Sequence, residues 1–86
     1  MPEVSRFFGI VIQMYYDEHE PPHFHALYSG DEVQIAIDPI HVLRGELPPR
    51  AISLVIEWAA LHQHELMDNW HLARQDQKPR KIQPLR

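Results

Sequence analysis

The stretch HFHALYSGDEVQIAID (residues 23–38) decides the fold. Apolar and other side chains alternate over 23–29 and again over 32–38, and this period of two is typical of half-buried β-strands. The tripeptide Ser-Gly-Asp at 29–31 separates the two runs, and its glycine can take the positive φ that tight hairpin turns need. The stretch therefore predicts two antiparallel strands joined by a short turn, with Phe24 on the buried face.

Similar patterns flank this hairpin. The even-numbered positions over residues 8–16 are all apolar, so we predict one strand there. The segment IHVLRG (residues 40–45) is a candidate for a short fourth strand or an irregular crossing. The first half of the chain thus predicts a small antiparallel sheet of three or four strands.

The second half of the chain has helical spacing. Pro48 and Pro49 suit the first turn of a helix, where the backbone N–H groups need no intrahelical partner. Apolar residues then recur at intervals of three and four: Ala51, Leu54, Val55, Trp58 and Leu61. A second set, Leu66, Trp70 and Ala73, is displaced by one position, which indicates one kinked helix or two helices joined near residues 62–65. Helices covering one face of the sheet give an α+β fold, with both tryptophans in the core.

The length of the chain indicates one small domain, and its charge distribution sets a basic C-terminal segment apart from an acidic body. The chain has 86 residues and no cysteine, which excludes disulfides and thiol catalysis. Residues 1–76 hold all 12 acidic residues and four basic ones, whereas residues 77–86 hold four basic residues and no acid. We therefore expect a single domain over 1–76 and a flexible basic tail over 77–86 that can contact nucleic acid or an acidic partner.

The apolar run FFGIVI (residues 7–12) is far too short to span a membrane and lacks a cleavage site behind it. We expect no membrane association and a cytoplasmic location.

Two histidines close to the first proline pair are the main candidate site. His23 and His25 are two residues apart, so in an extended strand their side chains share a face. With Phe24 inward, both rings should project onto the open face of the sheet, near Val11, Gln13, Tyr15 and Gln34. The prolines at 21 and 22 restrict the backbone just before the pair and reduce the entropy cost of holding it in place.

Three uses of this pair are consistent with the sequence. The rings can hold a divalent metal, zinc or nickel, with a third ligand drawn from the same loop: Asp17, Glu18, His19 or Glu20. They can also serve as general base and acid in RNA cleavage without a metal, beside Arg6 or Arg44. The structural alternative is that they only hydrogen-bond to loop carbonyls and pack at the turn.

A second polar constellation is His64, Asp68 and His71. The three residues fall along one helical face, and histidine and aspartate are both competent metal ligands. The same spacing is more typical of a solvated polar face, which is the interpretation we favour.

Three segments, SRFFGIVIQMYYDEHEPPHFHALYSG (5–30), GELPPRAISLVIEWAALHQHEL (45–66) and NWHLAR (69–74), resemble a family of short bacterial proteins, domain-of-unknown-function family 4160. The resemblance implies the motif positions His19, Pro22, His23, Phe24 and His25, together with Trp58, Asn69 and Trp70 in the helical half. It also implies a partner protein encoded by a neighbouring gene, in a pair similar to toxin–antitoxin systems.

We expect a protein-binding module that uses the His-rich loop and the open sheet face. The alternatives are a small metal-independent ribonuclease using His23 and His25, and a domain that binds metal through His19, His23 and His25. The sequence leaves open whether the protein is an enzyme.

Overall fold

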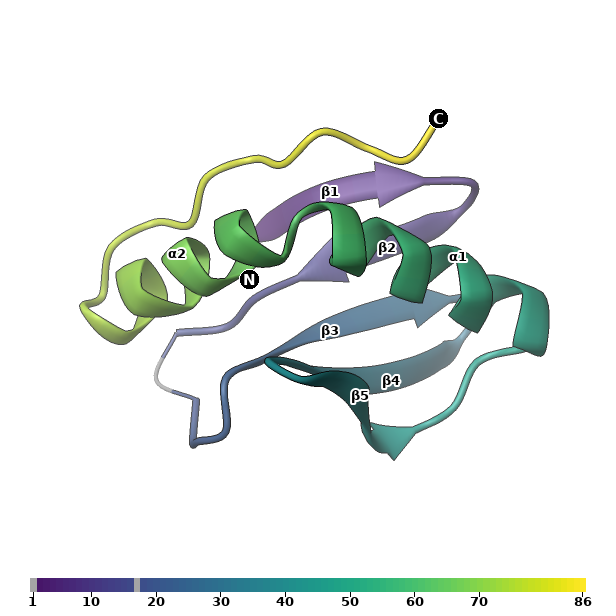
Figure 1. The fold of residues 1–86 in the computed structure, drawn as a ribbon, viewed down its shortest axis with the longest axis horizontal. Coiled ribbons are helices and arrows are strands. Elements are labelled where there is room, and N and C mark those ends of the chain that lie inside the picture. Colours follow the sequence, from purple (N-terminus) through teal and green to yellow (C-terminus); the bar gives the residue numbers. More distant parts are fainter. Residues whose placement is uncertain (1, 17) are drawn as a thin grey trace.

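The protein, seen in a computed structural model that describes residues 2–16 and 18–86, is a five-stranded antiparallel sheet followed by two helices. The strands lie in sequence order across the sheet, and both helices lie across one of its sides (Figure 1). The α+β class is therefore confirmed. The elements are β1 (Glu3–Phe7), β2 (Ile10–Gln13), β3 (His23–Tyr28), β4 (Asp31–Ile37), β5 (Ile40–Gly45), α1 (Pro49–Leu61) and α2 (Gln63–Arg74).

The strand predicted over residues 8–16 is present but shorter, as β2, and a strand that was not predicted, β1, precedes it. The two strands form a hairpin, because Phe8 and Gly9 have φ values of 50° and 81° and turn β1 back onto β2. Two consecutive positive φ values are the conformation of the tightest hairpin turns. Phe8 is apolar but 61 % exposed, so the alternation in the sequence continued through the turn and concealed it. The sheet consequently has five strands rather than three or four.

The remaining strand predictions are confirmed. Tyr28 pairs with Asp31 across a two-residue turn, and Ser29 and Gly30 both have positive φ. The segment 40–45 forms β5, which pairs with β4. Its register with β4 contains a bulge, which becomes important at the candidate site.

The helical half contains two helices rather than one kinked helix. They meet at His62, whose backbone N–H donates to the carbonyls of Trp58 and Ala59. Leu61, which the apolar spacing assigned to the buried stripe, is instead 67 % exposed. Leu61 is the last residue of α1, and the apolar positions of the second helix are displaced by one from those of the first.

Trp58 is the centre of the core, as predicted. Its side chain is fully buried and its ring lies 5.4 Å from that of Phe7 and 5.9 Å from that of Phe24, between centroids. Trp70 is buried as well. Among the described residues, no helix is both long and apolar enough to cross a membrane.

The C-terminal segment 77–86 is attached to the domain, in contrast to the expected flexible tail. It runs beside β1 as the yellow trace in Figure 1, and the Ile82 N–H donates to the Val4 carbonyl at 2.7 Å. The Asn69 side chain bonds both the N–H and the carbonyl of Arg80, each at 2.8 Å. The Trp58 indole N–H donates to the Gln83 carbonyl. Ile82 is buried, so this segment adds an apolar side chain to the core.

Candidate functional site

His23 and His25 project from the same face of β3, with ring centroids 5.2 Å apart, whereas Phe24 points to the core against Trp58. The alternation predicted from the sequence is therefore confirmed. The expected openness is not, because the two residues are only 7 % and 4 % exposed.

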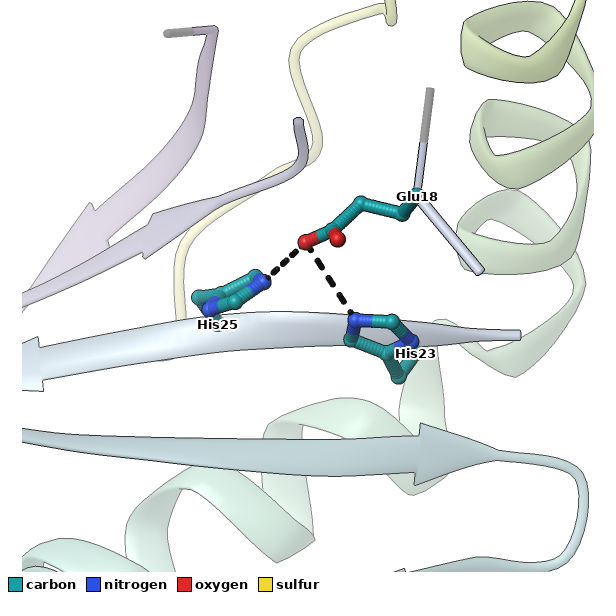
Figure 2. Close-up of side chains that lie close together, drawn as sticks. All are labelled: Glu18, His23 and His25. Atoms are coloured by element: carbon teal, nitrogen blue, oxygen red, sulfur yellow. Dashed lines mark hydrogen bonds and ion pairs between the residues drawn. The ribbon is translucent and has the colours of Figure 1, made fainter. Parts of the chain in front are cut away.

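Three neighbours cover the two rings. The Tyr15 ring lies 4.2 Å from the His25 ring, and the Trp70 ring of α2 lies 5.3 Å from the His23 ring, between centroids. The carboxylate of Glu18, from the loop between β2 and β3, lies over both (Figure 2). The loop between β2 and β3 and helix α2 thus bury two histidines on a face that sheet topology alone would leave open.

Strand pairing fixes the positions of the surrounding polar side chains. His25 lies between Gln13 on β2 and Gln34 on β4, as the sequence predicts. The Tyr15 hydroxyl donates to the Gln13 side-chain oxygen at 3.2 Å. Val11, also expected near the pair, is placed opposite Leu27.

The Nδ1 atoms of both histidines already have hydrogen-bond acceptors. His23 Nδ1 lies 2.8 Å from the Pro21 carbonyl oxygen, so this nitrogen carries the proton and donates it. His25 Nδ1 lies 2.7 Å from Glu32 Oε2. An imidazole that donates Nδ1–H to a carbonyl or carboxylate is fixed in its orientation and presents Nε2.

Both Nε2 atoms face one carboxylate oxygen. Glu18 Oε1 lies 2.6 Å from His25 Nε2 and 3.4 Å from His23 Nε2, as the dashed lines in Figure 2 show. One ligand atom from each of the three residues lies within 4.8 Å of the other two. Glu18 was one of the candidate third ligands, and it is the one that the fold brings to the pair.

The cluster has fewer N–H donors than acceptors. A carboxylate only accepts hydrogen bonds, and a neutral imidazole has a single N–H. His25 faces a carboxylate at each ring nitrogen, so in its neutral form it can satisfy only Glu32 or Glu18. The lone pair of His23 Nε2 also faces Glu18. With neutral rings and an ionised Glu18, the cluster therefore has a position between the rings and Glu18 that an added proton or a metal ion can fill.

The electrostatics agree with an ionised Glu18. Burial alone would raise the pKa of its carboxyl, but the hydrogen bond from His25 and the charges of His25 and His23 outweigh burial and hold the pKa below its usual value. Burial, together with the negative charges of Glu32 and Glu18, raises the pKa of the Tyr15 phenol. The tyrosine therefore stays neutral beside two anionic groups.

The other predicted site residues lie outside this cluster. His19 is exposed at its rim and contributes no atom to it, and Asp17 lies outside the described residues. Glu20 pairs with Arg74 at 3.1 Å. The Pro22 carbonyl accepts the N–H of Ile37.

The constellation His64, Asp68 and His71 does not form a second centre. His64 Nδ1 lies 3.4 Å from Asp68 Oδ2, and both side chains are largely exposed. Within residues 2–16 and 18–86, Glu18, His23 and His25 form the one group of three side chains spaced to hold a metal. The favoured interpretation of a solvated polar face agrees with this.

Glu32 is the site residue that sequence reasoning missed. The predicted hairpin contained the signal, because a two-residue turn at Ser29 and Gly30 places His25 opposite Gln34. Glu32 is then the diagonal neighbour of His25 on the same face, within reach of a long side chain.

The fold and this cluster define a small α+β domain in which two buried histidines and the partly buried Glu18 form a group that could hold a metal. Residues 9–71, more than half of the chain, match the family model described as "Domain of unknown function (DUF4160)", and the protein belongs to that family. Comparisons with curated proteins and with solved structures gave no match.

Proposed function

We propose that this protein is a divalent-metal-binding domain with Glu18, His23 and His25 as ligands. One observation carries the proposal: two Nε2 atoms converge on one oxygen of Glu18, while each Nδ1 already has an acceptor. Metal-ligating histidines almost always donate their other ring N–H to a carbonyl or carboxylate. Pro21 and Glu32 provide those acceptors.

The spacing of the ligand atoms suits a first-row metal ion. Two ligands at zinc distances of 2.0–2.1 Å on a tetrahedral ion are about 3.3 Å apart. The separation between His23 Nε2 and Glu18 Oε1 is already 3.4 Å, whereas that between His25 Nε2 and Glu18 Oε1 is 2.6 Å. The carboxylate must therefore move back by less than about 1 Å.

The donor set also indicates the kind of centre. Two imidazoles and one carboxylate, without thiolate, suit zinc or nickel. Three protein ligands leave a coordination position for water or another ligand, as in catalytic zinc sites, where the metal supplies a Lewis acid.

The geometry gives less support to a metal-independent ribonuclease. General acid–base catalysis needs ring nitrogens within hydrogen-bond reach of a substrate. Both nitrogens of His25 and the Nδ1 of His23 have protein partners, and both rings are buried.

Calorimetric titration of tag-free protein with zinc tests the proposal. We expect one site with a Kd of about 10 μM or lower, a free energy near −6.8 kcal/mol. Glu18→Gln should weaken binding by at least about 100-fold, close to 2.7 kcal/mol. Glu57→Gln, on the exposed side of α1, is the matched control and should bind as the wild type does.

Circular dichroism of each variant checks that the fold is intact. A wild-type Kd weaker than about 100 μM, or equal affinities of a folded Glu18→Gln variant and the wild type, would contradict metal binding at this cluster.

A protein-binding module in a toxin–antitoxin-like gene pair is the second candidate. It is supported by β5, which ends the order of strands and exposes Val42 and Leu43. An edge strand with exposed apolar side chains can accept a strand from another chain. Co-expression with the product of a neighbouring gene should give co-elution on size exclusion, whereas separate elution at micromolar concentration would count against this function.

A further inference from the structure

A cleft of about 380 Å³ adjoins the cluster on the side of β5. Glu18 and His23 line one part of it, and Gln34, Leu43 and Arg44 line another. The candidate metal centre is therefore not sealed from solvent on every side, although its two rings are buried.

Strand register explains why Arg44 faces this cleft. His25, Gln34 and Arg44 are paired across β3, β4 and β5, so their side chains project from the same face of the sheet. Neighbouring strands are about 4.8 Å apart, so the backbone of Arg44 is about 10 Å from that of His25. The arginine side chain covers part of this distance, and a small ligand in the cleft can fill the gap between its guanidinium and the cluster.

A β-bulge adds to this arrangement. Gln34 pairs with Arg44 and Ile35 with Val42, so Leu43 is an extra residue in β5. Bulges redirect side chains and often occur beside active sites. Here the consecutive residues Leu43 and Arg44 both line the cleft.

The charges in the cleft favour an anion once a metal is bound. The guanidinium of Arg44 makes no hydrogen bond or ion pair with any side chain in the described part of the chain. The carboxylate of Glu20, which also lines the cleft, is paired with Arg74. Glu18 is a ligand of the proposed metal ion, so the divalent ion and Arg44 together outweigh the remaining negative charge.

We propose that this cleft binds a phosphate group between the metal ion and Arg44, an inference that rests on the proposed function. A three-ligand centre leaves a coordination position that an anionic oxygen can take. The planar guanidinium fork matches the remaining phosphate oxygens. The ligand class is therefore a phosphate-bearing small molecule, and its binding requires the metal, because Glu18 would otherwise repel it.

Cobalt(II) provides the test, since it uses the same nitrogen and oxygen donors as zinc and its visible absorption reports its coordination. Tag-free protein in excess over Co²⁺ is titrated with inorganic phosphate. We expect a saturable spectral change with an apparent Kd of about 1 mM or lower. Isothermal titration of metal-free protein with phosphate should show no binding.

Arg44→Gln is the informative variant. It should keep the affinity for Co²⁺ and raise the apparent Kd for phosphate at least about tenfold, because a charge-assisted bidentate contact is lost. Arg50→Gln is the matched control at the exposed start of α1, outside the cleft, and should bind phosphate as the wild type does. Acetate should bind at least about tenfold more weakly than phosphate, since it has fewer oxygens to share between the ion and Arg44.

The possible failures are distinguishable. If the wild type does not bind Co²⁺ or zinc, the proposed metal centre itself is wrong. If Co²⁺ binds but phosphate leaves the spectrum unchanged, or if Arg44→Gln binds phosphate as the wild type does, the phosphate site is overturned while the metal centre stands. If acetate binds as tightly as phosphate, the ligand class is wrong.

Discussion

At the scale of single residues, the hydrogen-bond acceptors of the His23 and His25 rings determine which ring nitrogens are left for a ligand. Pro21 and Glu32 accept from Nδ1 of His23 and His25, and this leaves both Nε2 atoms facing Glu18. In the proposed metal centre, Glu32 therefore contacts no metal ion itself and acts by fixing the orientation of the His25 ring.

Removing the Glu32 carboxylate should weaken zinc binding without removing a ligand. We predict that Glu32→Ala raises the zinc Kd about 10–100-fold, the usual effect of losing the acceptor behind a ligating histidine. Glu32→Gln should recover part of the loss, because its amide oxygen can still accept from Nδ1. Calorimetry measures both variants, with Asp31→Asn on the same turn as control. Equal Kd values for Glu32→Ala and the wild type would contradict this role.

Gly45 is a residue whose replacement should be costly for a different reason. It has φ +81°, and a Cβ there would lie 2.3 Å from the Glu32 carbonyl oxygen, whereas a Cβ at Gly30, with φ +90°, meets nothing within 4 Å. Gly30→Ala should lower the free energy of unfolding by about 1–2 kcal/mol through backbone strain alone. Gly45→Ala should lower it by at least about 1 kcal/mol more, through the added clash. Urea denaturation measures both, and equal losses would exclude the clash.

At the scale of elements, the attached C-terminal segment is the main departure from expectation. Ile82→Ala should lower the free energy of unfolding by about 2–4 kcal/mol, because Ile82 is buried and its loss leaves a cavity. Lys81→Ala, one residue earlier and exposed, should be within about 0.5 kcal/mol of the wild type. Urea denaturation followed by tryptophan fluorescence measures both. A neutral Ile82→Ala would mean that the segment contributes no packing in solution.

The ends of an element can be predicted from the sequence where its pattern of apolar residues is interrupted. The turn at Ser29 and Gly30 and the change of helical stripe before Leu66 both interrupt a pattern, and both are found. The hairpin at Phe8 was missed because an exposed apolar residue extends the alternation through the turn. The attachment of 77–86 was missed because it depends on backbone hydrogen bonds to distant segments, which a run of basic residues does not indicate.

The candidate site was predictable to the same limited degree. Alternation places His23 and His25 on one face, and loop proximity provides Glu18 as one of several candidate ligands. The burial of the pair was not predictable, because it depends on how Tyr15, Trp70 and the loop close over it.

At the scale of the whole molecule, a metal ion that binds only the folded state should raise the free energy of unfolding. With 86 residues the domain is small, and a ligand that binds only the folded state at 100 times its Kd stabilises it by about 2.7 kcal/mol. For a domain of this size that free energy corresponds to a rise in Tm of about 10–20 °C. Thermal unfolding with zinc and then with excess chelator measures it. The Glu18→Gln variant should show no rise, and an equal rise in both proteins would place the metal elsewhere.

The most direct measurement is a crystal structure of zinc-loaded, tag-free protein with anomalous diffraction at the zinc edge. The metal-centre proposal predicts one strong peak within about 2.0–2.2 Å of His23 Nε2, His25 Nε2 and a Glu18 carboxylate oxygen. A strong peak at His64 and His71 with none between His23 and His25 would contradict it.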